Sequence, residues 1–248
     1  MYSPYFNIAS SADPFGAGLT GSITNIDQSA GTYVRLSQTA AYMTPTIAGF
    51  QGTLAYAFGG QPGNNSNGRG YAAALTYGNG PISAGASYLN HNYTNFVQST
   101  GLPTGTYETN KLWNIYGGYD FGLAKVTAYY SDAKYGSGLG GLYMASNAAA
   151  TSEWKTWMLG ATVPVGPGAV LASYGQTKNN NVSSSTAKQF AIGYTYALSK
   201  RTNLYTSYSH ITNDSNVDYF VGDATIAGTG TLGGNSSSGF ALGIKHSF

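Results

Sequence analysis

Apolar and polar side chains alternate strictly in short segments of the chain. Between residues 189 and 198, every second position is apolar: Phe190, Ile192, Tyr194, Tyr196 and Leu198. The positions between them carry small or polar side chains. A period of two is typical of a β-strand whose two faces meet different surroundings. The pattern therefore predicts an all-β fold.

Eleven segments share this alternation, and each is close to the roughly 9–11 residues that a tilted membrane strand needs. The predicted strands are residues 33–43, 50–58, 69–78, 82–92, 111–121, 124–134, 154–164, 168–178, 189–198, 202–212 and 239–248. The pattern does not assign the two faces of the segment 202–212.

The connections between these segments alternate in length. Five are short and contain Gly, Pro or Asn: residues 44–49, 79–81, 121–124, 164–168 and 199–201. Five are long and polar: residues 59–68, 93–110, 135–153, 179–188 and 213–237. A transmembrane barrel has short periplasmic turns and long extracellular loops, whereas a soluble β-sandwich has no reason for this rhythm. We expect a transmembrane antiparallel β-barrel.

The chemistry of the two faces agrees with a barrel. The apolar face suits lipid, and the opposite face is small and polar, as a water-filled lumen requires. Charged residues on the apolar phase, such as Lys155 and Lys188, lie beside a long loop, where they reach the rim.

Composition excludes several other classes of protein. Only 8% of the residues are charged, against about a quarter in soluble proteins. No apolar run approaches the roughly 18–20 residues of a membrane-spanning helix. The net charge of +2 gives no bulk attraction to nucleic acid, and the absence of cysteine excludes disulfides and thiolate metal sites. No secretory signal is visible at the start of the chain.

The number of predicted strands is odd, whereas closure of an antiparallel barrel needs an even number. If the last strand ends on the short-turn side, the first strand also runs toward that side. Residues 1–32 then lie on the long-loop side, and we expect at least one strand to precede residue 1.

With the strands placed, the sequence resembles the general porins of β-proteobacteria over its whole length. The matching motifs are Tyr2-Ser-Pro-Tyr5, Asp13-Pro-Phe-Gly16, Tyr119-Asp-Phe-Gly122, the turn Leu198-Ser-Lys-Arg-Thr202 and the ending Gly243-Ile-Lys-His-Ser-Phe248. The turn and the C-terminal strand are the most specific of these.

The resemblance implies a sixteen-stranded barrel, usually trimeric, whose third extracellular loop folds inward and narrows the pore. Residues 1–248 would form one porin domain. In it, residues 1–32 are the constriction loop and residues 33–248 are strands six to sixteen of the parent barrel. Five strands and the signal peptide are then absent from this chain.

The function that the resemblance implies is general diffusion through the outer membrane of a Gram-negative bacterium. Ions and small hydrophilic solutes would pass through a water-filled pore without a cofactor. The implied partners are outer-membrane lipid and lipopolysaccharide, two further copies in a homotrimer and the outer-membrane assembly machinery.

Asp13 and Arg35 are the best candidates for the pore constriction, together with Pro14 and Phe15 beside them. A carboxylate on an inward loop opposite a lumen-facing guanidinium would set a transverse field that biases which ions pass. Arg35 lies two positions from the polar residue Ser37, so both side chains are predicted to point into the lumen. The alternative is an Asp that caps a turn and an Arg at the rim.

Three further charged residues, Asp120, Lys125 and Lys245, fall on the lumen phase near the short-turn end. We expect them to line the periplasmic vestibule, or else to be solvated rim charges. Phe248 is the expected assembly signal, since the resembled family ends on an aromatic residue in an alternating strand.

Other functions have less support in the sequence. No HExxH or GxSxG motif is present, and we predict neither an enzyme nor a metal site. His210 with Asp214 or Asp132 is the one pairing that resembles an outer-membrane protease. A substrate-specific channel and an adhesive or structural barrel also stay open, and single-channel conductance separates them from a general porin.

Overall fold

Eleven antiparallel strands form one continuous sheet in chain order. The computed structural model describes residues 1–16, 19–60, 62–96, 103–136, 152–222 and 233–247. The strands are β1 (Thr39–Met43), β2 (Phe50–Ala57), β3 (Gly70–Asn79), β4 (Ile82–Phe96), β5 (Pro103–Asp120), β6 (Lys125–Tyr135), β7 (Ser152–Val165), β8 (Gly168–Asn179), β9 (Thr186–Ser199), β10 (Thr202–Asn213) and β11 (Ser237–His246).

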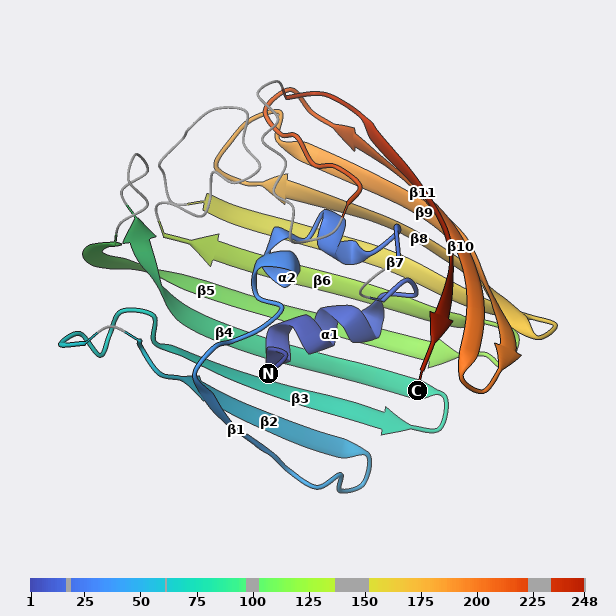
Figure 1. Ribbon diagram of the computed structural model, residues 1–248, viewed down its shortest axis with the longest axis horizontal. Helices are drawn as coiled ribbons and strands as arrows, with labels where there is room; N and C mark the ends of the chain where they lie inside the picture. Colours follow the sequence, from blue (N-terminus) through green and yellow to red (C-terminus); the bar gives the residue numbers. More distant parts are fainter. Residues whose placement is uncertain (17–18, 61, 97–102, 137–151, 223–232, 248) are drawn as a thin grey trace.

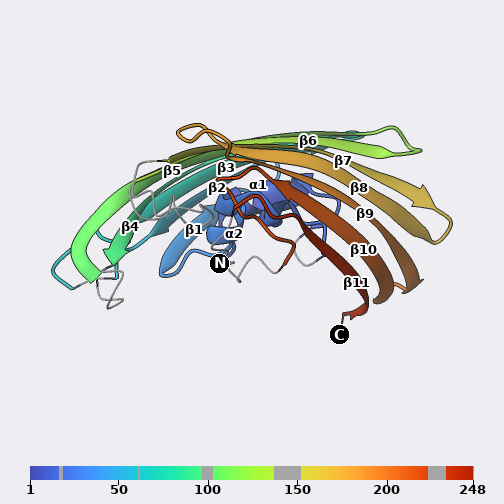
Figure 2. The same ribbon diagram turned by 90° about the horizontal axis from the view of Figure 1, so that it is seen from above.

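The sheet is strongly curved, and the N-terminal segment lies on its concave side (Figures 1 and 2). This segment, residues 1–36, contains α1 (Pro4–Ala12), the short 3-10 helix η1 (Ile23–Asn25) and α2 (Gln28–Thr32). β1 and β11 are the two edge strands in the described part of the chain. No helix among the described residues is long and apolar enough to cross a membrane.

All eleven predicted strands are confirmed. The ends of β1, β4 and β5 differ most from the prediction, and the ends of the other strands differ by three residues or fewer. β1 begins at Thr39 rather than at residue 33, because Gln38 has a positive φ of 48° that interrupts an extended strand. β4 and β5 continue through much of the expected loop 93–110, where Tyr93 still pairs with Glu108. Backbone pairing continues there because it does not depend on the apolar side chains that mark a strand in the sequence.

The strand extensions also change two of the expected long connections. Only residues 97–102 and 180–185 separate β4 from β5 and β8 from β9. The connections between β6 and β7 and between β10 and β11 remain long. The tight turns gather at one end of the sheet (Figure 1).

The outer, convex face exposes large apolar side chains on every strand. Leu54 is 63% exposed, Phe240 71% and Leu242 75%. The structure also assigns the faces of β10, where Ser207 and Ser209 are buried and Tyr208 points outward. A contiguous apolar surface of this size indicates contact with lipid or protein.

Candidate functional site

The N-terminal segment packs the apolar side of α1 against the concave wall. Ser3 begins the helix, since its hydroxyl accepts a hydrogen bond of 3.0 Å from the Phe6 amide, and Pro4 follows at the first helical position. Tyr5, Ile8, Ala9 and Ala12 are buried. Asn7 and Ser11 are exposed on the other side of the helix. α1 thus turns a polar face toward the free space inside the sheet.

Wall side chains also hold the segment by its backbone carbonyl groups. Asn114 Nδ2 donates to the Tyr5 carbonyl at 2.9 Å. Thr127 Oγ1 donates to the Ala12 carbonyl at 2.6 Å. Gln189 Nε2 donates to the Gly21 carbonyl at 2.9 Å. These donors come from β5, β6 and β9, so the segment is fixed across the middle of the sheet.

Asp27 forms a buried polar contact between the segment and the wall. Its Oδ2 accepts hydrogen bonds from Tyr129 Oη at 2.7 Å and Ser131 Oγ at 2.9 Å. Its Oδ1 accepts from the Ala30 amide at 3.0 Å and so caps α2. Burial raises the pKa of Asp27, and these hydrogen bonds oppose that shift. Asp27 therefore joins the helix start to β6.

Asp13 has a structural role at the end of α1. Its Oδ1 accepts from the Phe15 amide at 2.9 Å and its Oδ2 from the Ile23 amide at 2.7 Å. The side chain is only 7% exposed. Burial raises the pKa of Asp13 to about 7, and the two backbone hydrogen bonds act against that rise. The carboxylate thus ties α1 to η1.

Pro14 and Phe15 dock the same bend onto the wall. Phe15 is 3% exposed and packs with Leu171 and Ala191. Pro14 lies against Gly160, where an added Cβ would stand 2.6 Å from the proline ring. A Cβ at Gly193 would likewise stand 3.0 Å from Phe15. These glycines leave hollows in the wall into which the segment fits.

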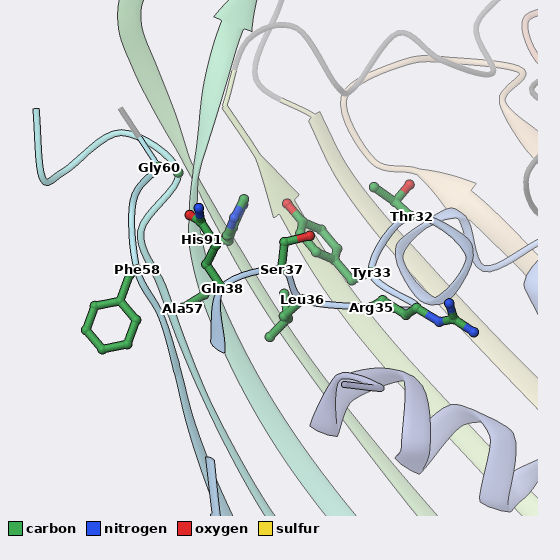
Figure 3. Close-up of a pocket in the computed structure, with 11 residues that line it drawn as sticks. Thr32, Tyr33, Arg35, Leu36, Ser37, Gln38, Ala57, Phe58, Gly60 and His91 are labelled. Atoms are coloured by element: carbon green, nitrogen blue, oxygen red, sulfur yellow. The ribbon is translucent and has the colours of Figure 1, made fainter. Parts of the chain in front are cut away.

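Arg35 is exposed at the end of the segment, and its guanidinium lies over the ring of Tyr2. Its guanidinium carbon lies 5.2 Å from the centre of the Tyr2 ring, and Nη2 donates to Tyr2 Oη at 3.5 Å. It lines a cavity of about 300 Å³ together with Thr32, Gln38 and His91 (Figure 3). The cation is thus carried by the inward segment.

A second cavity of about 400 Å³ lies beside α1 and is lined by residues of α1 and of β1 to β5. The exposed polar residues of α1, Asn7 and Ser11, line one side of it. Gln51, Thr53 and Thr76 line the other side. Polar groups thus face each other across the space between the segment and the wall.

The structure does not bring Asp13 and Arg35 together. The carboxylate is buried in hydrogen bonds to backbone amides, and the guanidinium stacks on Tyr2. The structure thus gives the two charges separate partners, and a transverse field between them stays a prediction. The sequence analysis did not single out Asp27. Its signal was its place directly before α2, where an Asp side chain caps the helix by accepting from the Ala30 amide.

Three of the other predicted site residues lie on described strands, and their role in lining the pore stays a prediction. Asp120 and Lys125 are direct partners across β5 and β6, at the short-turn end of the concave face. Asp120 also accepts a hydrogen bond of 2.8 Å from the Gly122 amide, which caps the turn. Lys245 pairs with Asn203 on the edge strand β11. Phe248 lies outside the described residues.

The alternative His–Asp pairing finds no geometric support. His210 Nδ1 forms a hydrogen bond of 2.7 Å with Ser238 Oγ. Asp214 accepts from the Thr186 amide, and Asp132 forms an ion pair with Lys155. Among the described residues, no group of three His, Asp or Glu side chains could hold a metal ion.

Known proteins resemble the chain in sequence and in fold. A family model described as Gram-negative porin matches residues 1–216. An outer membrane porin protein of Bordetella pertussis is 29% identical over 99% of this chain. The outer membrane porin protein 32 of Delftia acidovorans is 29% identical over 87% of it.

A solved structure shares the fold. The anion-selective porin from Comamonas acidovorans superimposes with a TM-score of 0.69 at 24% identity and covers 100% of this chain. The chain spans 66% and 57% of the lengths of the two sequence relatives and 66% of this solved chain.

Proposed function

The chain belongs to the Gram-negative porin family, and we propose that it forms the wall and the constriction of a general diffusion pore. It is an outer-membrane protein of a Gram-negative bacterium. The pore would pass ions and small hydrophilic solutes passively, and we propose no catalytic step. The complete barrel would have sixteen strands, of which β1 to β11 are the sixth to the sixteenth.

The observation that carries this proposal is the position of residues 1–36. A segment with exposed polar residues on α1 lies on the concave side of a sheet whose convex side is apolar and exposed. Burying the exposed apolar face in lipid gains about 25 cal/mol per Å². The concave side would then enclose water, and the segment would narrow the passage.

We infer that Arg35 is the charged residue of the constriction. Both carboxylates of the segment, Asp13 and Asp27, are buried and hydrogen-bonded. Arg35 is exposed and lines a cavity on the concave side. The free charge that the described segment presents to the passage is therefore positive, which favours anions.

Asp13, Pro14 and Phe15 act on the constriction indirectly, by fixing the bend after α1. We further propose that Asp120, Lys125 and Lys245 line the wider opening at the short-turn end. Phe248 would serve barrel assembly, with the assembly machinery as its partner. The whole protein would form a homotrimer in contact with outer-membrane lipid and lipopolysaccharide.

Planar-bilayer recording tests the proposed function. A diffusion pore predicts discrete current steps whose size rises in proportion to KCl concentration. Saturation of the conductance by a single sugar or carboxylate would indicate a substrate-specific channel instead. Protein that inserts, as shown by heat-modifiable migration on a gel, and yet carries no current would contradict both kinds of channel.

A further inference from the structure

Five of the eight lysines of the chain form a row on the outer face of the sheet. We name this set the lysine row: Lys111, Lys134, Lys155, Lys178 and Lys188, on the five consecutive strands β5 to β9. Their chain neighbours Leu112, Trp154 and Ala187 are buried at 0%, 2% and 0% exposure. Because side chains alternate along a strand, the lysines point outward.

The strand register places like charges directly opposite each other. Lys111 pairs with Lys134 across β5 and β6, and Lys155 pairs with Lys178 across β7 and β8. Lys188 lies opposite Gln176 on the next strand. Like charges directly opposite in an antiparallel pair are destabilising unless an anion lies between them.

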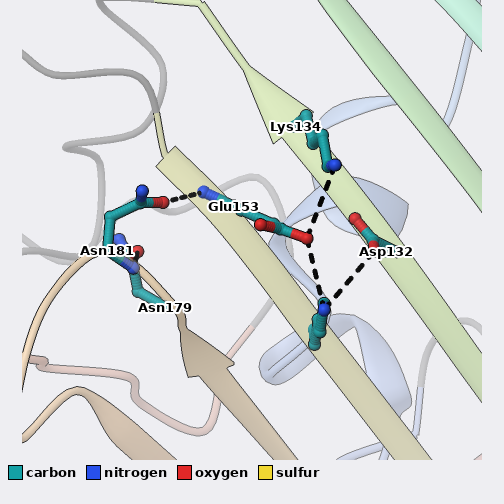
Figure 4. A network of polar contacts seen from close by, with 6 residues as sticks. Asp132, Lys134, Glu153, Asn179 and Asn181 are labelled. Atoms are coloured by element: carbon teal, nitrogen blue, oxygen red, sulfur yellow. Dashed lines mark hydrogen bonds and ion pairs between the residues drawn. The ribbon is translucent and has the colours of Figure 1, made fainter.

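Two carboxylates compensate only part of this charge. Glu153 lies 3.7 Å from Lys134 and 3.3 Å from Lys155, and Asp132 lies 3.9 Å from Lys155 (Figure 4). Lys111, Lys178 and Lys188 are exposed and form no ion pair with another described residue. The five lysines of the row and the two carboxylates between them leave an excess of three positive charges, which Asp214 beside Thr186 partly offsets.

The position of the row relative to the apolar face indicates what meets it. Aromatic side chains lie two to four positions further along the same strands, away from the long-loop end: Trp113, Tyr130, Trp157, Tyr174 and Phe190. Trp113 and Tyr130 lie 5.4 Å apart between ring centres, and Trp157 and Tyr174 lie 5.7 Å apart. Aromatic residues gather at the boundary between lipid tails and headgroups.

A strand rises about 3.3 Å per residue, so the lysines stand roughly 7–13 Å beyond the aromatic rings along the strands. That is the level of lipid headgroups. Strands lie about 4.8 Å apart, so the row spans on the order of 19 Å from β5 to β9. This width accommodates more than one phosphate group.

We propose that the lysine row binds the phosphate groups of lipid headgroups in the leaflet on the long-loop side. The ammonium groups bind phosphate directly, so a bridging divalent cation is not required. The site rests on the membrane placement proposed above but does not depend on conduction.

Two charge-matched double variants of the protein test the site. Lys178→Gln/Lys188→Gln removes two cations from the row, and Lys200→Gln/Arg201→Gln removes two exposed cations from the tight turn at the other end of β9. Binding is measured in detergent micelles doped with bis-phosphorylated lipid A or with its dephosphorylated form. Heat-modifiable migration verifies that both variants are folded.

The row variant should bind the phosphorylated lipid about tenfold more weakly than the parent, and the turn variant should bind within about twofold of it. The dephosphorylated lipid should bind weakly to all three proteins. Equal weakening in both variants, unchanged binding of the row variant, or equal binding of the dephosphorylated lipid would overturn the site.

Two further measurements separate a headgroup site from general anion binding and from the activity of the pore. Inorganic phosphate alone, without lipid, should bind far more weakly than the lipid; equal affinity would refute a headgroup site. Single-channel conductance is recorded on the same samples. Loss of lipid binding with unchanged conductance supports the lysine row, whereas lipid binding by a protein that carries no current would refute only the pore.

Discussion

The hydroxyl of Tyr129, on the wall, donates a hydrogen bond of 2.7 Å to the carboxylate of Asp27, on the inward segment. The two residues are 102 positions apart in the chain. Ser131 donates to the same oxygen, and all three side chains are buried. This buried contact joins the segment to the sheet, so its removal should loosen the segment.

Asp27→Ala should release the segment from β6. The substitution leaves two buried hydroxyl groups without an acceptor, at a cost of about 1–3 kcal/mol each, and removes the cap of α2. We expect a larger single-channel conductance with more current noise. Tyr129→Phe is the matched control, because it removes one hydrogen bond and leaves Ser131 bound to Asp27. If Asp27→Ala folds and conducts as the parent does, Asp27 does not hold the segment.

Gly160→Val should displace the bend that contains Pro14. An added Cβ at Gly160 would lie 2.6 Å from the Pro14 ring and 2.7 Å from Thr127 Oγ1, so the segment must move. Gly117→Ala is a suitable control on the outer face of β5, since no atom lies within 4 Å of its added Cβ. Exclusion of neutral polymers of graded size measures the pore radius, which should change only in the Gly160 variant. An equal change in both variants would argue against the docking of Pro14.

Arg35→Gln should reduce the preference of the pore for anions. Arg35 is the exposed charge of the described segment, whereas Asp13 is buried among backbone amides. The reversal potential in a tenfold KCl gradient should move toward that of K⁺ in Arg35→Gln. At pH 8 the potential of Asp13→Asn should change less. If Asp13→Asn shifts the reversal potential more than Arg35→Gln does, Asp13 rather than Arg35 is the charged residue of the constriction.

The stability of the folded protein should fall as the pH rises. Burial raises the pKa of Asp13 from 3.8 to about 7 and also raises that of Asp27. The folded protein therefore binds more protons than the unfolded chain between about pH 4 and pH 7, and stability falls across that window. The thermal unfolding midpoint should be lower at pH 8 than at pH 5. The difference should shrink in Asp13→Asn; a midpoint that rises from pH 5 to pH 8 would contradict the raised pKa values.

The sequence predicted the strands of this protein far better than the surroundings of the charged residues in the inward segment. Alternation between lipid-facing and lumen-facing residues is a local property, so even the end strand containing Phe240 and Leu242 was found from the pattern alone. The start of β1 was not predicted, since the positive φ at Gln38 has no signature in the hydrophobic pattern.

The charged residues of the inward segment could not be placed in the same way. Asp13 was assigned to the passage because its motif resembles a constriction loop. Its burial follows from the fold of residues 13–23, in which the Phe15 and Ile23 amides converge on one carboxylate. Asp27 depends on a contact with Tyr129 across 102 positions, which one sequence does not reveal.

Thiol modification during single-channel recording tests the central claim, that residues 1–36 line a water-filled pore. The native chain contains no cysteine. Ser11→Cys places a thiol on the exposed face of α1, and Ala128→Cys places one on the convex face of β6, opposite Leu159. A negatively charged methanethiosulfonate reagent should lower the current of Ser11→Cys in discrete steps and leave that of Ala128→Cys unchanged. Complete modification of Ser11→Cys, verified by mass spectrometry, without a change in current would contradict the account.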